Sequence, residues 1–355
     1  MGARPYGGAM TPPPPMLPAD PPPADPSRRV DLVLEGGGVK GIAIAGALEV
    51  LAERGYTVNR VAGSSAGAMA GALAAAGVPA RRLVEILRGT DYRAFQDGGW
   101  WTRTLPGMAL AIALRNGVHP GKRLESWTRE QLEAHAPSPV RTFADLAYAD
   151  PDGEEIAGPA TRLTVTASDL SAGRLRFLPE DAAAYGQEPG AMDVAQAVRA
   201  SASIPFVFRP ARFTDALGRA AWLVDGGLLS NFPVEVFDRP GGRAPRWPTF
   251  GVKLSERPTE AAGPVHRIRG PLSYAKAVAG TVTGFYDRMH IESSHAVART
   301  IFIDTSAVKP TEFDLSDEQR EALYAEGREA AIQFLDGDAT HEAWDFARYV
   351  ERFRS

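Results

Sequence analysis

The stretch Gly36-Gly37-Gly38-Val39-Lys40-Gly41 decides the fold of this chain, together with Gly63-Ser64-Ser65-Ala66-Gly67 a short distance downstream. The first follows the apolar run 30–34 and opens a helical pattern, so its unpaired backbone N–H groups can face a negative charge. The second is a G-x-S-x-G turn, whose glycines let a serine occupy a sharp strand-to-helix corner with its hydroxyl exposed. In this order the two motifs predict an anion-binding loop beside a nucleophile, which is most of what acyl transfer requires.

Composition narrows the function classes. The formal net charge of −4 gives no basic face for phosphate backbones, so no nucleic-acid partner is expected. The chain has no cysteine, which excludes disulfides, thiolate metal sites and a cysteine nucleophile and is compatible with a cytoplasmic location. The six histidines show no metal-binding spacing, so neither a metal nor a cofactor is predicted. No apolar run reaches the roughly 18 residues of a membrane span.

The 355 residues divide into three compositional zones. Residues 1–28 contain repeated prolines and are expected to form a disordered tail, for which an inert leader is favoured over an interaction ligand. Residues 29–336 have the alternating pattern of one α/β domain, and residues 337–355 are expected to form a C-terminal tail or helix. Patterning predicts strands at 31–35, 58–62, 161–167, 221–224, 248–254 and 300–304, and helices at 39–54, 66–76, 191–200 and 317–335. Strands that alternate with helices predict a mostly parallel sheet covered on both faces.

The chain resembles the patatin-like phospholipases over about residues 30 to 336. The resemblance is carried by four motifs in the family's order: the glycine loop 36–41, the serine turn 63–67, Ala200-Ser201-Ala202-Ser203-Ile204-Pro205, and Asp225-Gly226-Gly227 with Asn231-Phe232-Pro233. It implies a three-layer α/β/α patatin-like fold with a mostly parallel central sheet. It also implies a Ser–Asp dyad without histidine and metal-independent hydrolysis of acyl esters in phospholipids or related lipids.

The residues themselves support this chemistry. Ser65 is the candidate nucleophile, and an alcohol needs a base within hydrogen-bond reach to attack an ester. Asp225 is the candidate base, because it ends the apolar run 222–224, where partial desolvation would raise its pKa. The loop glycines are the candidate oxyanion hole, and Gly37 and Gly38 are the expected donors; the full candidate set is Gly36, Gly37, Gly38 and Gly41. An acyl-serine intermediate would then be released by water that the same aspartate activates.

Other interpretations of these residues stay open. Ser64 or Ser65 can be an ordinary helix N-cap, and Asp225 an Asp-Gly turn residue. The glycine loop also satisfies the dinucleotide fingerprint, although no acid follows the next strand. An α/β-hydrolase with a Ser-Asp-His triad would use a histidine after Asp225, of which the chain has four: His266, His290, His295 and His341. A non-catalytic lipid-binding protein is a further alternative.

Three features near these motifs carry weaker expectations. Lys40 can hold a phosphate head group or be a solvated lysine, and Asp169 is expected to be a structural turn residue. Residues 108–114 are too short to span a bilayer, so they predict either a buried or an interfacial helix, and the buried core helix is favoured because they are apolar all round. The adjacent pair Trp100 and Trp101 suggests a loop that makes peripheral contact with membranes, because indole rings suit the head-group region.

Overall fold

A computed structural model describes residues 28–150, 160–255, 257, 270, 293–339 and 342–354 of the chain. The predicted tail, except Arg28, therefore lies outside the described residues. The central sheet has the strand order β10-β9-β1-β2-β4-β8-β7, and β5 pairs with β4 beside this row. Its strands are β1 (Arg29–Leu34), β2 (Thr57–Gly63), β4 (Leu163–Asp169), β5 (Arg174–Leu178), β7 (Ala211–Thr214), β8 (Ala220–Asp225), β9 (Thr249–Lys253) and β10 (Thr300–Phe302).

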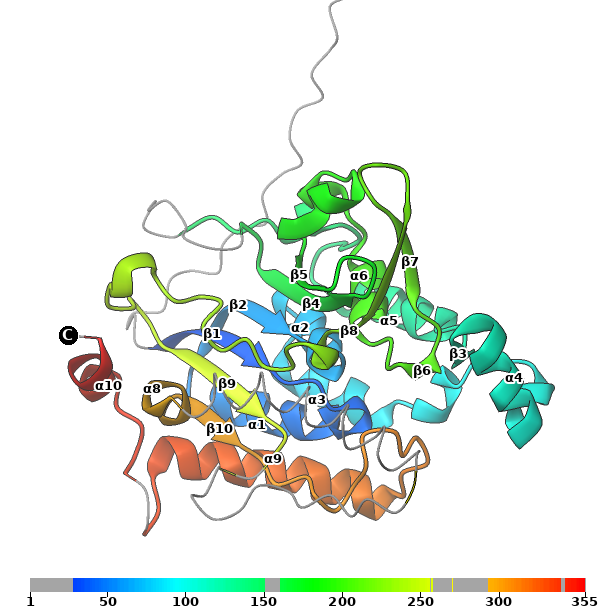
Figure 1. Cartoon of the computed structure of the whole chain (residues 1–355). Coiled ribbons are helices and arrows are strands. Elements are labelled where there is room, and N and C mark those ends of the chain that lie inside the picture. Colours follow the sequence, from blue (N-terminus) through cyan, green and yellow to red (C-terminus); the bar gives the residue numbers. More distant parts are fainter. Residues whose placement is uncertain are drawn as a thin grey trace, which may run out of the picture.

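The pairings from β10 across to β4 are parallel, whereas β8, β7 and β5 are antiparallel to their neighbours. The described helices lie between the strands or follow the last of them, as Figure 1 shows. They are α1 (Gly41–Glu53), α2 (Ala66–Ala75), α3 (Ala80–Gly89), α4 (Leu105–Arg115), α5 (Lys122–His135), α6 (Val194–Ser201), α8 (Ser294–Ala298), α9 (Asp317–Asp336) and α10 (Phe346–Phe353). The predicted α/β class with a mostly parallel central sheet is thus confirmed.

Alternation along β1 divides the core between the two faces of the sheet. Leu32 and Leu34 belong to the main core, which includes the buried residues of α1 and α2. Val33 belongs to a second cluster, with Phe232 and Phe237 of the segment after β8. Among the described residues, the two faces of the sheet are therefore covered by different elements. Helices cover one face, and the 232–237 segment with α8 covers the other.

Small residues bring α1 and α9 into close contact. A Cβ added at Gly46 would collide with the carbonyl oxygen of Tyr324, and one at Gly327 with that of Ala43. Figure 1 shows α9 running beneath the sheet, with α1 between them. The long final helix predicted from the sequence is thus a packed element of the main body.

The C-terminal segment, which includes α10, also packs on this body. The Trp344 ring stacks on Phe334 with centroids 5.4 Å apart and meets Phe250 edge-on at 5.0 Å. Tyr349 of α10 is buried. Aromatic contacts therefore join residues 342–354 to β9 and α9.

Short 3-10 helices and one small parallel sheet complete the described fold. The small sheet pairs β3 (Gly117–His119) with β6 (Phe206–Phe208). The 3-10 helices are Gly38–Lys40, Tyr92–Phe95, Trp100–Arg103, Phe143–Leu146, Glu180–Tyr185, Pro189–Ala191, Gly226–Leu228 and Pro240–Gly242. The strands β3 and β6 have three residues each and are too short for periodicity to predict.

Helix α4 differs from its prediction. The sequence predicted a core helix for residues 108–114, but Ala111 is the buried residue of α4, and Leu110 and Leu114 are 52% and 70% exposed. The prediction is wrong because hydrophobicity alone does not supply a packing partner, and α4 projects from the edge of the molecule beside β3 and β6 (Figure 1). Within the described residues, no helix combines the length and apolar character that crossing a bilayer requires.

Candidate active site

The turn between β2 and α2 holds Ser65 in a strained backbone conformation. Ser65 has φ +49° and ψ −118°, in a region that residues with a Cβ rarely adopt. The flanking glycines permit this turn: a Cβ at Gly63 would collide with the backbone of Gly67, and one at Gly67 with the carbonyl oxygen of Leu34. The G-x-S-x-G pattern therefore reflects steric need at both glycines.

Ser64 and Ser65 make different contacts. The Ser64 hydroxyl pairs with the Thr166 hydroxyl and donates to the Ser230 carbonyl oxygen over 3.2 Å, so it ties the turn to its surroundings. Ser65 is the N-cap residue of α2, but its side chain makes no capping hydrogen bond. Its backbone N–H instead donates to Ser201 Oγ at 2.8 Å. The N-cap interpretation therefore does not account for the Ser65 hydroxyl.

Asp225 ends β8 and lies beside Ser65. The Ser65 side chain interacts with its carboxylate, and the N–H of Gly227 donates to Asp225 Oδ1 at 2.8 Å. Burial raises the pKa of Asp225 to about 6, while these two interactions act in the opposite direction. The backbone N–H of Asp225 donates to the Ser203 carbonyl oxygen at 3.0 Å, which links β8 to the 200–205 segment. Asp225 thus makes the expected Asp-Gly turn contact and also faces the serine.

The glycine loop lies against Ser65. A Cβ built on Gly36 would be 2.9 Å from the Ser65 Cβ. Asn231 holds Gly36 at both ends of its backbone: the Gly36 N–H donates to Asn231 Oδ1 at 3.1 Å, and Asn231 Nδ2 donates to the Gly36 carbonyl oxygen at 2.8 Å. The sequence singled out Asn231 only as part of a motif. The structure gives it a positioning role between the loop and the turn after Asp225.

The four loop glycines are not equivalent as hydrogen-bond donors. The N–H of Gly36 is used by Asn231, and that of Gly41 donates to the Gly38 carbonyl oxygen. Within the described residues, the N–H groups of Gly37 and Gly38 have no protein acceptor. Of the four candidate glycines, Gly36 and Gly41 thus use their N–H groups within the protein, whereas Gly37 and Gly38 stay candidate oxyanion donors.

The far side of the loop is fixed by the segment before α9. Gly38 has φ +56°, and a Cβ there would collide with the carbonyl oxygen of Pro310. The same oxygen accepts the N–H of Val39 at 3.2 Å. Glycine is therefore required at position 38 for both conformation and space.

An ion pair lies at the base of the loop. Glu35 accepts hydrogen bonds from the Lys253 ammonium and from the backbone N–H of Leu254. Lys40 is half-buried, and burial lowers its pKa, against the opposing effects of Glu35 and Asp304. Lys40 is therefore not a fully solvated lysine.

Asp169 is a structural turn residue, as predicted. It ends β4 and accepts hydrogen bonds from the N–H groups of Ser171 and Ala172 at 2.9 and 3.0 Å. The Tyr185 hydroxyl donates to its second oxygen at 3.0 Å. These contacts leave it occupied by its own turn.

None of the histidines within the described ranges hydrogen-bonds to Ser65 or Asp225. His295, one of the four triad candidates, bonds to Glu235 Oε1 at 2.9 Å instead. His266, His290 and His341 lie outside the described residues. The triad alternative therefore has no support from His295.

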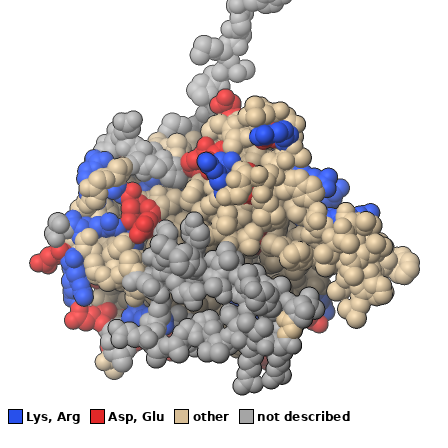
Figure 2. Space-filling view, in the orientation of Figure 1, with Lys and Arg blue, Asp and Glu red and all other residues tan. Residues whose placement is uncertain are grey.

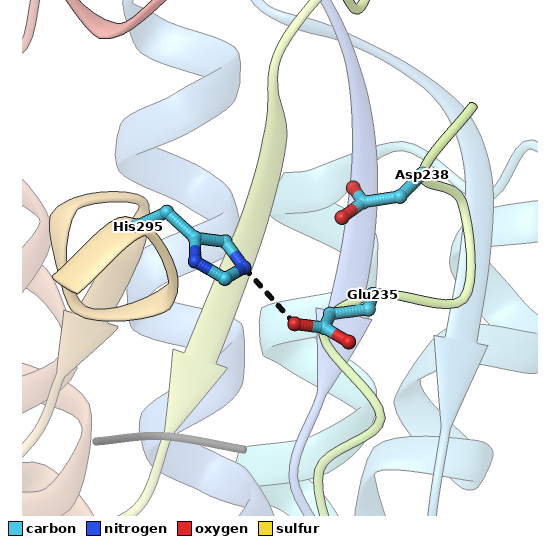
Figure 3. Close-up of side chains that lie close together, drawn as sticks. All are labelled: Glu235, Asp238 and His295. Atoms are coloured by element: carbon cyan, nitrogen blue, oxygen red, sulfur yellow. Dashed lines mark hydrogen bonds and ion pairs between the residues drawn. The ribbon is translucent and has the colours of Figure 1, made fainter. Parts of the chain in front are cut away.

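His295 belongs to a group that resembles a cation site. Ligand atoms of Glu235, Asp238 and His295 lie within 4.8 Å of one another, and Figure 3 shows the His295 ring directed at Glu235. However, Asp238 accepts hydrogen bonds from Arg299 at 2.6 and 3.0 Å and also pairs with Arg354. Two guanidinium groups thus already neutralise Asp238, so these three side chains form a poor cation site.

Comparisons with known proteins give a family match and several similar proteins. The family model described as patatin-like phospholipase matches residues 32–238, more than half of the chain. The uncharacterized protein YqhO of Bacillus subtilis (strain 168) is 35% identical over 307 residues, which are 86% of this chain and 98% of that protein. An uncharacterized NTE family protein of Mycobacterium tuberculosis is 28% identical over 210 residues, 59% of this chain and 28% of that protein. The crystal structure of VipD from Legionella pneumophila is similar with a TM-score of 0.48 and 20% identity, over 86% of this chain and 66% of that chain.

The chain belongs to the patatin-like phospholipase family. Family membership supports lipid acyl hydrolysis as the general class of activity and lipids as the class of substrate. The dinucleotide-binding interpretation of the glycine loop loses its basis, because the whole motif is part of this family's domain.

Proposed function

We propose that the protein is a lipid acyl hydrolase that uses Ser65 as nucleophile and Asp225 as general base. The observation that carries the proposal is the pairing of Ser65 with a buried carboxylate whose pKa is raised to about 6. The backbone of Ser65 is strained, and its side chain makes no capping hydrogen bond. An aspartate with this pKa is ionised at neutral pH, yet it is a stronger base than one in water.

In the first half of the reaction, the Ser65 hydroxyl gives its proton to Asp225 as its oxygen attacks the ester carbonyl carbon. The carbonyl oxygen then carries a negative charge, which the N–H groups of Gly37 and Gly38 can stabilise. Collapse of this intermediate breaks the bond to the alcohol portion of the lipid. That alcohol leaves with the proton from Asp225, and the acyl group stays on Ser65.

In the second half, a water molecule gives its proton to Asp225 and attacks the acyl-serine carbonyl carbon. The same two N–H groups face the developing charge. Collapse returns the proton from Asp225 to the Ser65 oxygen and releases the fatty acid. One carboxylate is sufficient for both halves because it regains its ionised form at the end of each.

Surrounding contacts support a fixed geometry for these steps. Ser201 holds the backbone of Ser65, Asn231 holds Gly36, and Gly227 donates to Asp225. Rigid hydrogen-bond partners of this kind reduce reorganisation during reaction. They are positioning residues, because none of them would exchange a proton with the substrate.

The proposal is tested with a fluorophosphonate probe and a panel of phospholipids and lysophospholipids whose products are read by mass spectrometry. Wild type should be labelled at Ser65 and should release fatty acid. Ser65→Ala should abolish both, whereas Ser64→Ala should leave the label on Ser65. Labelling of Ser64 in the Ser65→Ala protein would contradict the assignment.

A second arm tests the triad esterase. A variant with His266, His290, His295 and His341 all changed to glutamine should keep most of its activity if Asp225 acts without histidine. Loss of nearly all activity, with an unchanged melting temperature, would replace the dyad with a triad.

A further inference from the structure

Exposed apolar side chains concentrate in one part of the molecule, the α4 arm (residues 100–115). Eight large apolar side chains are exposed among the described residues, and half of them lie in this arm: Trp100, Leu105, Leu110 and Leu114. Trp100 is 82% exposed. In Figure 2 the same projection is almost wholly free of charged groups. Contiguous exposed apolar surface of this kind marks an interaction site.

The apolar side chains occupy the outward side of α4. Pro106, Leu110 and Leu114 follow helical spacing, with Ala109 and Ala113 beside them, and all five are exposed. The buried position, Ala111, faces the body. A surface helix of a globular protein normally has the opposite arrangement, with polar residues outward. The outward face of α4 therefore suits an apolar environment.

The arm carries positive charge and no acidic residue of its own. No acidic residue occurs between Asp97 and Glu125 in the sequence. The Arg115 guanidinium lies 5.8 Å from the centre of the Trp101 ring. It also acts electrostatically on Arg209, whose pKa is lowered by burial and by Arg115. A positively charged side chain beside an apolar face is the arrangement that binds anionic lipid surfaces.

The arm is continuous with the proposed active site. It leads directly into β3, which pairs with β6 through Gly117 and Phe206. Phe206 is 64% exposed and follows Ser203, whose carbonyl oxygen holds the backbone of Asp225. Phe208 packs edge-on against Phe313, with centroids 6.1 Å apart. A short parallel sheet therefore connects the arm to the segment beside Asp225.

We propose that the α4 arm inserts its outward apolar face into an anionic lipid bilayer and so places the Ser65 site at the membrane surface. The part that docking would play in catalysis rests on the proposed function. The binding of the arm to lipid does not, because it depends only on the arm's own residues. The indole of Trp100 suits the head-group region, and the leucines suit the acyl-chain boundary. Arg115 then faces the anionic head groups.

The test compares two pairs of exposed leucines in the full chain. The arm variant carries Leu110→Gln and Leu114→Gln, and the control carries Leu170→Gln and Leu217→Gln, at sites that are 52% and 75% exposed outside the arm. Binding is measured in the Ser65→Ala background by co-sedimentation with vesicles of phosphatidylcholine and phosphatidylglycerol. We expect the arm variant to bind at least about tenfold more weakly and the control to bind like the parent.

Activity supplies a second arm of the test, in the protein that retains Ser65. The arm variant should lose a similar factor on vesicle phospholipid and should hydrolyse a short monomeric ester like the unmodified protein. Equal vesicle binding by the two leucine variants would overturn the docking proposal. So would a dimer in size-exclusion chromatography that only the arm variant disrupts, since a second copy would then cover α4. Failure of wild type on both substrates would contradict the proposed function and leave the binding comparison valid.

Discussion

Helices α2 and α4 are two short apolar helices in opposite environments. Every residue of α2 is buried, whereas α4 buries Ala111 and exposes its leucines. Alanine and glycine dominate α2 on all sides, so a strand or helix can approach it from any direction. The leucines of α4 lie on a side with no packing partner among the described residues, and they create apolar surface there. Both helices are apolar, so the neighbouring elements decide which of them is buried.

The N-termini of the two helices differ in the same way. Thr104 caps α4, because its side chain accepts the N–H of Gly107 at 3.2 Å. Ser65 occupies the corresponding position of α2 and makes no such bond, and its hydroxyl faces Asp225. One hydroxyl thus stabilises its helix, and the other is free for chemistry.

The largest expected effect separates these two hydroxyl groups. Ser65→Ala should lower kcat on a monomeric ester by about 10⁴-fold or more, because nucleophile and base act as a unit. Its melting temperature should stay close to that of wild type, since no capping bond is lost. Thr104→Ala should keep the activity and lose about 1 kcal/mol of unfolding free energy. If Ser65→Ala destabilised the protein and left activity intact, Ser65 would be a cap like Thr104.

The sequence predicted α2 and its turn well because their causes are local. Glycines at 63 and 67 mark a turn that only glycine permits, and the apolar strands beside them have clear boundaries. The Ser65–Asp225 pairing came from the family resemblance and the strand before Asp225. It could not be derived from local sequence, because the two residues lie far apart along the chain.

Other parts of the site and fold depend on tertiary contacts. Ser201 and Asn231 lie in recognisable motifs, but their hydrogen bonds to Ser65 and Gly36 appear only when α6 and the turn after β8 meet the loop. For α4, the pattern could not distinguish a core helix from a projecting one. The lack of acidic residues between Asp97 and Glu125 fits a core helix and an apolar surface helix equally well.

The next largest effect concerns Asp225, the buried carboxylate beside the serine that precedes α2. Asp225→Asn should lower kcat about 10³-fold, because the general base is removed. Wild-type kcat/KM should rise with pH through a limb near 6, the pKa to which burial raises Asp225, and the residual activity of the variant should lack this limb. A variant that retained more than about a tenth of wild-type turnover would contradict the role of Asp225.

The same carboxylate affects stability. The folded pKa of about 6 lies above the ordinary value of 3.8, so the folded state binds a proton more tightly. The stability from this protonated group is present below about pH 4 and is lost as pH rises through 6, by up to about 3 kcal/mol. Between these pH values, urea denaturation should show Asp225→Asn gaining stability relative to wild type. A constant difference would mean that Asp225 is not desolvated.

Packing around the two helices is tested by the same substitution in each. Ala70 of α2 is fully buried and Ala113 of α4 is exposed. Ala70→Leu should lower the free energy of unfolding by about 3 kcal/mol, because added methylenes must displace packed neighbours. Ala113→Leu should change it by less than about 0.5 kcal/mol. Denaturant titration measures both, and similar losses in the two variants would mean that α4 packs in solution as α2 does.

The smallest expected effect concerns the charge at the base of α4. Each cationic side chain near an anionic bilayer contributes about 1 kcal/mol, so Arg115→Gln should weaken binding to phosphatidylglycerol-containing vesicles by about fivefold. Binding to pure phosphatidylcholine should not change, and the difference should shrink at high salt, because ions screen the attraction. Arg81→Gln on α3 is the matched control, since it removes the same charge from an exposed position outside the arm. Equal losses in the two variants would mean that net charge, and not the position of Arg115 beside Trp101, sets the preference for anionic lipid.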